Sequence, residues 1–104
     1  MKPIGTHNYF IYIVTNRNKT VLYIGVTNDL ARRLEEHKED SFKGKRTYAG
    51  KYNCYYLLYY EHFDYIEDAI DREKEIKGWI RAKKESLINS LNPNWEFLNY
   101  NIEE

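Results

Sequence analysis

The segment NDLARRLEEH contains two neighbouring arginines that helical geometry sends in different directions. At about 100° per residue, Arg33 lies on one stripe with Leu34 and His37, whereas Arg32 points almost the opposite way. Arg32 is therefore expected in solvent. Arg33 leans toward the core, where it extends along apolar surface without a function, holds a structural carboxylate, or stabilises negative charge on a substrate.

Glu73 is also a charged residue on a stripe that faces the core, but its charge is negative. It lies near the centre of an apolar stripe that runs from Ala69 through Ile76, and further if the helix continues past Gly78. A carboxylate at such a position costs on the order of several kcal/mol unless a cation, hydrogen bonds or a metal offsets the cost. Two explanations stay open: a structural ion pair with Arg33, or a metal-binding carboxylate beside a positive clamp.

A single carboxylate suits Mg²⁺ or Mn²⁺, because these ions keep most of their waters and accept a few protein oxygens plus a substrate phosphate. Tyr12 and Tyr23 could carry protons through their phenols, and His37 could donate or accept a further proton. Arg33 could stabilise the charge that develops on a reacting phosphate. Together with Glu73, these side chains could attack a phosphodiester, although spacing alone does not single out this chemistry.

A hairpin near the start of the chain is expected to bring the two tyrosines together. Residues 9–14 (YFIYIV) form an apolar run without alternation, which is typical of a strand covered on both faces. Residues 20–26 (TVLYIGV) predict its partner strand, and NRNK between them has turn chemistry. A two-residue loop centred on residues 17–18 would place Tyr12 opposite Tyr23.

The rest of the chain predicts helices and one further strand. The expected elements are a helix that begins at Thr27 or Asn28 and runs to about residue 38, an irregular segment over 40–53, a strand over 54–63, a helix that opens with the capping-box pattern DYIE at 64–67 and reaches about residue 77, and a last helix over 79–89. We therefore expect one α/β domain over residues 1–104, with its core over about 8–98. Its sheet should be small, three-stranded and antiparallel, and flanked by helices.

Composition and cysteine content exclude several classes of protein. The chain has 104 residues, of which 42% are hydrophobic and 31% charged, as in an ordinary globular domain. No run approaches the roughly 18 apolar residues of a membrane span, and MKPIGTHNYF lacks a secretory apolar region, so we expect a cytoplasmic protein. Cys54 is the single cysteine, which excludes an internal disulfide and a Cys-rich zinc site.

Two sequence features permit nucleic-acid binding without requiring it. Sixteen basic residues balance sixteen acidic ones, yet the acid-free stretch over 42–60 contains Lys43, Lys45, Arg46 and Lys51. This stretch either contacts a phosphate backbone or is a solvated loop. The eleven tyrosines either offer stacking surfaces for unpaired bases or, as in CYYLLYYEHF, pack in the core.

These residues and their order resemble those of the GIY-YIG nuclease superfamily, and specifically its small single-domain bacterial members, which are similar to the N-terminal nuclease domain of a bacterial excinuclease. FIY at residues 10–12 and YIG at residues 23–25 correspond to the two name motifs, with Phe10 in place of the first glycine. NDLARRLEEH corresponds to the arginine helix, AIDREKEIKGW to the glutamate helix and NPNW to the closing motif. The resemblance covers nearly everything from Tyr9 to Leu98.

The resemblance also implies a role for each matching residue. Glu73 would coordinate one divalent metal, and Arg33 would bind or polarise the scissile phosphate. Tyr23 would activate a water or act as a phenolate, and Tyr12 would position it. His37 matches a histidine that is common after the arginine, and Gly25 would allow backbone or phosphate to approach closely. Asn92 is the candidate for the distal asparagine of the family, with Asn89 as its competitor.

Three hypotheses of function follow. The first is a metal-dependent endonuclease that cuts DNA, with DNA repair or recombination as its setting. The second is a nucleic-acid-binding module of the same fold with weak or no catalysis, which the zero net charge motivates. The third is a protein-interaction domain in which Arg33 and Glu73 form a structural pair.

Overall fold

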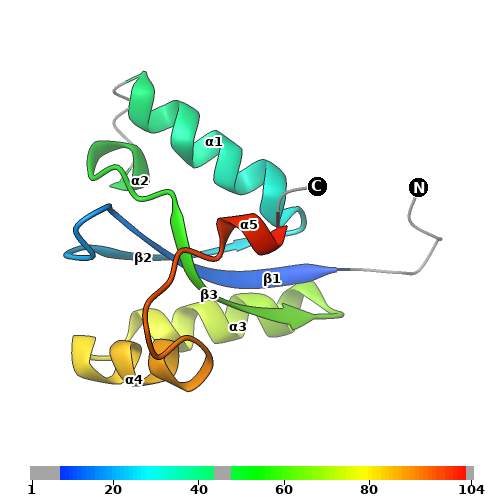
Figure 1. Ribbon diagram of the computed structural model, residues 1–104. Coiled ribbons are helices and arrows are strands. Elements are labelled where there is room, and N and C mark those ends of the chain that lie inside the picture. Colours follow the sequence, from blue (N-terminus) through cyan, green and yellow to red (C-terminus); the bar gives the residue numbers. More distant parts are fainter. Residues whose placement is uncertain (1–7, 44–47, 103–104) are drawn as a thin grey trace.

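One antiparallel sheet lies between two layers of helices in the computed structural model, which describes residues 8–43 and 48–102 (Figure 1). The strands are β1 (Tyr9–Thr15), β2 (Leu22–Thr27) and β3 (Tyr56–Phe63), in the order β2-β1-β3. Both strand pairs are antiparallel. The predicted α/β fold, with a sheet made of an N-terminal hairpin and one later strand, is confirmed.

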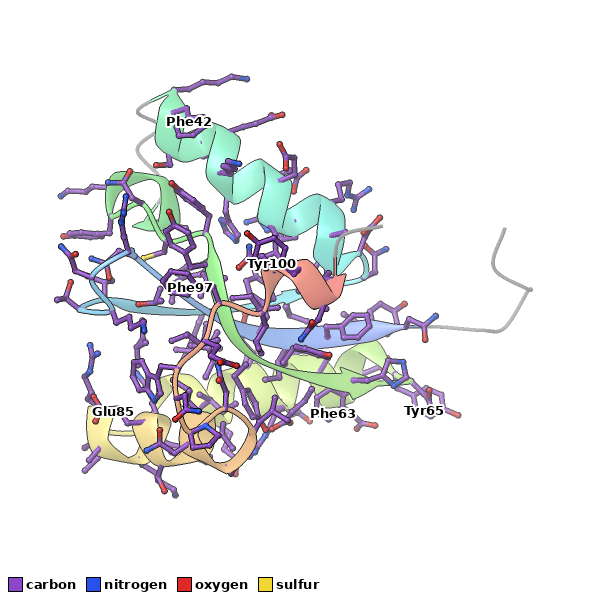
Figure 2. All side chains as sticks on the ribbon, viewed as in Figure 1. Phe42, Phe63, Tyr65, Glu85, Phe97 and Tyr100 are labelled. Atoms are coloured by element: carbon purple, nitrogen blue, oxygen red, sulfur yellow. The ribbon has the colours of Figure 1, made fainter. Side chains whose placement is uncertain are left out.

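The helices divide between the two faces of the sheet. On one face lie α1 (Leu30–Phe42), α2 (Tyr48–Lys51) and α5 (Asn99–Ile102), and on the other lie α3 (Ile66–Lys77) and α4 (Arg81–Leu91) (Figure 1). Side chains fill the spaces between the sheet and both helical layers (Figure 2). No helix in the described part of the chain combines the length and the apolar character that crossing a membrane requires.

The central strand β1 contributes to two separate cores. Ile11 and Ile13 pack with α3 and α4, whereas Tyr12 and Val14 pack with α1 and α2. All four side chains are buried, because successive residues of a strand point to opposite faces. This arrangement confirms that the unbroken apolar run is a strand covered on both faces.

The turn between β1 and β2 is longer than the two-residue loop that we expected. Asn16 closes it: its side-chain oxygen accepts hydrogen bonds from the backbone amides of Thr20 (2.8 Å) and Val21 (3.1 Å). Lys19 adopts a left-handed backbone conformation with φ 61°. Residues 16–21 therefore all belong to the turn, because a side chain competes with the strand ladder for these amides.

The predicted register of the hairpin was consequently wrong by two residues. Tyr12 lies opposite Gly25, and Tyr23 lies opposite Val14. A slip of two residues preserves the face to which each side chain points. Both tyrosines therefore still belong to the core beneath α1, although they are not cross-strand partners.

Helix α1 begins at a different cap and ends later than predicted. Asp29, rather than Thr27 or Asn28, is the N-cap, since its carboxylate accepts a hydrogen bond of 3.1 Å from the backbone amide of Arg32. The helix then continues to Phe42.

The ends of α3 also differ from the prediction. Its N-cap is Tyr65, which makes no side-chain capping hydrogen bond, so the predicted capping box does not form. The helix ends at Lys77 with Gly78 as its C-cap, and Ile80 is exposed. The apolar stripe on which Glu73 lies therefore stops at Ile76.

The segment predicted as irregular is partly helical. Residues 40–42 extend α1, and α2 occupies Tyr48–Lys51. Cys54 then donates its backbone amide to Ala49 (2.8 Å), and β3 begins two residues later, at Tyr56. The expected strand start at residue 54 was therefore too early.

Candidate functional site

Gly25 makes room for the side chain of Tyr12. The two residues are cross-strand partners, and a Cβ atom at Gly25 would collide with the hydroxyl and ring of Tyr12. Tyr12 is 1% exposed, so its phenol has no open space into which it could retreat. The absence of a side chain at Gly25 therefore lets the phenol extend across the edge strand β2.

His37, from α1, meets this phenol. The Tyr12 hydroxyl and His37 Nε2 form a buried hydrogen bond of 2.8 Å. Burial, followed by the charge of Arg33, lowers the pKa of His37 to about 4. Burial raises the pKa of Tyr12 to about 12, against the opposing effect of Arg33. At neutral pH the pair is therefore an uncharged imidazole and a protonated phenol.

Tyr23 packs against the same imidazole. Its ring centroid is 5.4 Å from that of His37 at an interplanar angle of 74°, an edge-on contact. The corresponding distance from Tyr12 to His37 is 5.7 Å. Tyr23 is only half-buried, whereas Tyr12 is fully buried, so Tyr23 is the phenol that water can reach.

Arg33, on α1, borders the rings described above. Its side chain is 34% exposed and donates to Glu36 Oε1 at 3.1 Å. Its charge and a hydrogen bond to Tyr12 act to lower the pKa of that phenol. Arg32 is exposed, as the helical spacing predicted. Partly exposed ion pairs such as Arg33–Glu36 contribute only about 0–1 kcal/mol, so the guanidinium can exchange this partner for an anionic ligand.

Glu73 lies in the opposite layer, where its charge acts weakly on the same phenol. Helix α3 packs against β1 and β2, and the negative charge of Glu73 acts to raise the pKa of Tyr12. The Glu73 side chain is 17% exposed, and its Oε2 lies 3.5 Å from Lys77 Nζ. Because β2 is an edge strand and Gly25 has no side chain, groups from both layers can act at one edge of the sheet. We call Tyr12, Tyr23, Arg33, His37 and Glu73 the edge cluster.

The structural ion pair between Arg33 and Glu73 is not found among the described residues. Arg33 pairs with Glu36, and Glu73 pairs with Lys77. The two charges lie on helices that cover opposite faces of the sheet. A direct Arg33–Glu73 pair therefore does not explain why both charges are present, and each has a local partner on its own helix.

The donor set fits one divalent ion that keeps most of its waters. Within residues 8–43 and 48–102, no group of three or more His, Cys, Asp or Glu side chains could hold a metal. A single partly exposed carboxylate such as Glu73 is nonetheless what Mg²⁺ or Mn²⁺ uses together with substrate phosphate. The Lys77 contact is long and on a half-exposed side chain, so it would yield to a dication.

The predicted substrate-binding lysines and arginine lie outside the edge cluster or outside the described residues. Lys43 follows α1, has a 64% exposed side chain and lies 4.0 Å from Glu39. Lys45 and Arg46 fall outside the described residues. A contact between this basic stretch and a phosphate backbone therefore stays a prediction.

Asn92, the candidate distal asparagine, lies apart from the edge cluster, and its predicted role in substrate binding stays a prediction. Its amide nitrogen donates to the backbone carbonyls of Leu58 (3.1 Å) and Glu96 (2.8 Å), and its oxygen accepts from the Glu96 amide (3.0 Å). Its competitor, Asn89, accepts a hydrogen bond from Trp95 Nε1. Asn92 is 5% exposed and fastens the segment after α4 to β3, which is the far strand from the edge cluster.

Two residues of the site were missed in the sequence. Glu36 follows Arg33 by three positions, and Lys77 follows Glu73 by four. Both spacings place opposite charges together on a helix, so the signal was present.

Comparisons with known proteins relate this chain to a family of catalytic domains. Residues 8–86 match the family model of the GIY-YIG catalytic domain. A UPF0213 protein of Natronomonas pharaonis is 36% identical over 81 residues, covering 78% of this chain and 91% of its own. A UPF0213 protein of Bacillus pumilus is 34% identical, covering 82% and 83%. The solution structure of the UPF0213 protein BH0048 from Bacillus halodurans matches with a TM-score of 0.53 at 30% identity, covering 89% of this chain and 93% of that one.

Proposed function

Because this chain belongs to the GIY-YIG family of catalytic domains, a family of nucleases, we propose that it is a metal-dependent endonuclease that hydrolyses DNA phosphodiester bonds. The observation that carries the proposal is the convergence of two phenols, a neutral imidazole, a guanidinium and a carboxylate at one edge of the sheet. Phosphodiester hydrolysis requires a proton acceptor for water, positive charge at the phosphate and a site for a metal.

Tyr23 is assigned to the attacking water. It is the more accessible of the two phenols, and its ring packs edge-on against the neutral imidazole of His37. Tyr12 is assigned a positioning role, because it is fully buried and its raised pKa keeps it protonated. Its hydrogen bond orients His37, and His37 in turn packs against Tyr23.

Arg33 is assigned to the phosphate. A guanidinium stays charged at any physiological pH and presents several donors in a fixed plane, which suits phosphate oxygens. Its partial exposure and replaceable partner Glu36 leave it able to bind an anion. It would stabilise the negative charge that grows on the phosphate during attack.

Glu73 is assigned to the metal. Its carboxylate would hold Mg²⁺ or Mn²⁺, and the bound ion would supply Lewis-acid polarisation of the phosphate and a more acidic water. Lys77, now beside Glu73 Oε2, would lose this contact and come to lie near substrate phosphate.

The proposal is tested with a panel of labelled substrates: linear, nicked, flapped and branched DNA, and a matched RNA. Each is incubated with the protein in Mg²⁺, in Mn²⁺ and in excess chelator. We expect cleavage of at least one DNA substrate with either metal, and none with chelator. Cleavage that persists unchanged in chelator would contradict the metal assignment. Salt-sensitive binding without products from any substrate would favour a nucleic-acid-binding module of the same fold.

A further inference from the structure

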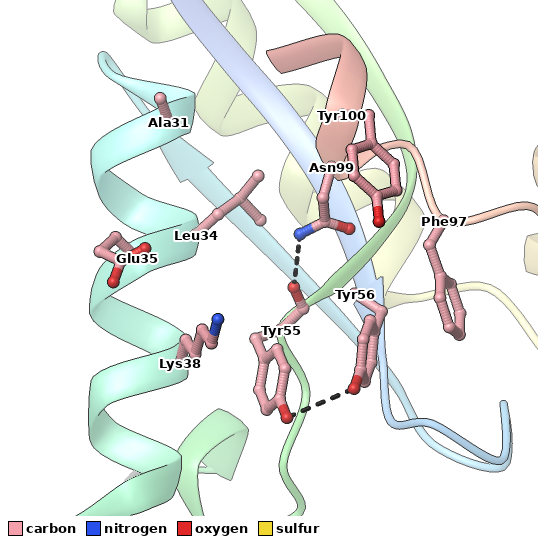
Figure 3. Close-up of a pocket in the computed structure, with 9 residues that line it drawn as sticks. All are labelled: Ala31, Leu34, Glu35, Lys38, Tyr55, Tyr56, Phe97, Asn99 and Tyr100. Atoms are coloured by element: carbon pink, nitrogen blue, oxygen red, sulfur yellow. Dashed lines mark hydrogen bonds between the residues drawn. The ribbon is translucent and has the colours of Figure 1, made fainter. Parts of the chain in front are cut away.

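A hollow lies beside α1, on a different side of the helix from the edge cluster. It has a volume of about 660 Å³ and is lined by α1, the start of β3 and the C-terminal segment (Figure 3). Lys38 is one of its α1 residues, whereas Arg33 and His37 face the edge cluster from a different side of the helix. We call this hollow the aromatic groove and define it by Lys38, Tyr55, Tyr56, Phe97, Asn99 and Tyr100.

The aromatic groove contains a preformed series of rings. Tyr55 and Tyr56 have centroids 4.5 Å apart, and Tyr56 stacks on Phe97 at 4.2 Å with an interplanar angle of 22°. The Tyr56 hydroxyl donates to the Tyr55 hydroxyl at 3.4 Å. Tyr100 stands at the rim with 87% of its surface exposed. A ring this exposed gains little from folding, so its contribution can come from a ligand that stacks on it.

Asn99 fixes the walls of the aromatic groove. Its nitrogen donates to the Tyr55 carbonyl at 3.0 Å (Figure 3). Its oxygen accepts from the Leu57 amide at 2.9 Å. Both polar atoms of the amide are therefore used in joining the C-terminal segment to β3. What remains for recognition is the exposed ring of Tyr100, the phenolic hydroxyls and those ring surfaces that Tyr55, Tyr56 and Phe97 do not cover on one another.

The charged side chains near these rings are two lysines and one glutamate, a small excess of positive charge. Lys38 lines the aromatic groove on the α1 side, and Lys19 Nζ lies 5.3 Å from the Phe97 ring centroid. Glu35 is the carboxylate among the lining residues. Rings flanked by two lysines suit a strand with flat bases and charged phosphates better than an apolar peptide.

We propose that the aromatic groove binds unpaired bases of a nucleic-acid strand, so that the substrate of the edge cluster carries a single-stranded segment. The groove and the edge cluster lie on two flanks of one helix, whose diameter with side chains is about 10–12 Å. An unpaired strand that leaves a duplex near the edge cluster would therefore reach the groove within a few nucleotides. The proposal rests on the proposed function for the chemical class of the ligand.

Binding of 5′-fluorescein-labelled oligothymidylate of eight nucleotides, followed by anisotropy, tests the groove directly. Tyr100→Ala should weaken binding by about 5-fold or more, because one base–aromatic stack has that effect or a larger one. Tyr65→Ala is the matched control, since Tyr65 is also an exposed tyrosine, 65% exposed, and lies beside α3 away from α5 (Figure 2). The affinity of Tyr65→Ala for oligothymidylate should equal that of the wild-type protein.

Cross-linking locates the contact independently. The same oligonucleotide with one 5-iodouracil should cross-link on irradiation to Tyr55, Tyr56, Phe97 or Tyr100, as read by mass spectrometry. Cross-links confined to residues outside the groove, wild-type affinity in Tyr100→Ala, or no binding by the wild-type protein would each overturn the proposal.

The two proposals fail separately. Loss of affinity in Tyr100→Ala, without cleavage of any substrate, would support the groove and reject the endonuclease. Metal-dependent cleavage by the wild-type protein, with unchanged oligothymidylate binding in Tyr100→Ala, would support the endonuclease and reject the groove.

Discussion

The phenol of Tyr12 occupies the space that a side chain at Gly25 would need, and its hydroxyl continues to His37 Nε2 at 2.8 Å. Three segments of the chain are thereby fixed to one another: β1 through Tyr12, β2 through Gly25 and α1 through His37. A change at any of the three positions should disturb the other two.

Gly25→Ala should damage both stability and cleavage. The new Cβ would displace the Tyr12 ring from His37, and overpacking of a filled core costs about 1–3 kcal/mol. Urea unfolding measures the first effect, and cleavage by the fully folded variant measures the second.

Gly78→Ala is the control for this substitution. A Cβ at Gly78 would meet only backbone oxygens at 3.5 and 3.7 Å, and the residue has a right-handed backbone with φ −78°. Alanine there should leave stability unchanged or raise it by about 0.4–1 kcal/mol. Equal effects at positions 25 and 78 would show that the Tyr12 contact is unimportant.

His37 should make folding stability depend on pH. Its pKa of about 4 in the folded protein lies below the value of about 6.5 in an unfolded chain, so the unfolded chain binds more protons between these values. The free energy of unfolding should therefore fall as the pH drops from about 6.5 to 4, by on the order of 2 kcal/mol. Urea unfolding at pH 7, 5.5 and 4.5 measures the slope.

Two variants isolate this effect. His37→Gln retains a hydrogen-bonding group but cannot titrate, so the slope should flatten. His62→Gln changes an exposed histidine and should keep the wild-type slope. A wild-type slope in His37→Gln would contradict burial of a neutral imidazole.

Arg33→Ala should lower the cleavage rate by about 10²-fold or more, as is typical when a charge-stabilising donor is lost. Arg32→Ala, one residue away and exposed, should change the rate by less than about 3-fold, since surface positions of this kind have small effects. Single-turnover cleavage with saturating protein compares the two. Comparable losses in both variants would assign Arg33 to general attraction of the polyanion.

Asn92→Ala should destabilise the protein without altering the chemistry of cleavage. Three hydrogen bonds are lost, and each contributes about 1 kcal/mol. Unfolding curves should shift accordingly, while the cleavage rate per folded molecule should stay unchanged. A stable but inactive variant would assign Asn92 to substrate binding instead.

The sequence predicted those features that depend on local periodicity. The unbroken apolar run over 9–14 indicated a strand covered on both faces, and helical spacing separated exposed Arg32 from half-buried Arg33. Both inferences follow from the repeat of a single element, and both are confirmed.

Features that depend on particular side chains or distant segments could not be predicted. The hairpin register depends on the hydrogen bonds that Asn16 makes across the turn, which a rule based on loop length ignores. The DYIE pattern predicted a capping box, but α3 begins at Tyr65 without a side-chain capping hydrogen bond. The aromatic groove brings Tyr55 beside Asn99, a pairing that no local pattern indicates.

Cleavage by Glu73→Gln tests the central claim most directly, on the substrate that the wild-type protein cuts best in Mg²⁺. Glu75→Gln, on the same helix and with a 54% exposed side chain, is the control. The edge cluster predicts that Glu73→Gln loses cleavage while it stays folded and still binds DNA, and that Glu75→Gln cleaves like the wild type. Full metal-dependent cleavage by folded Glu73→Gln would contradict the account.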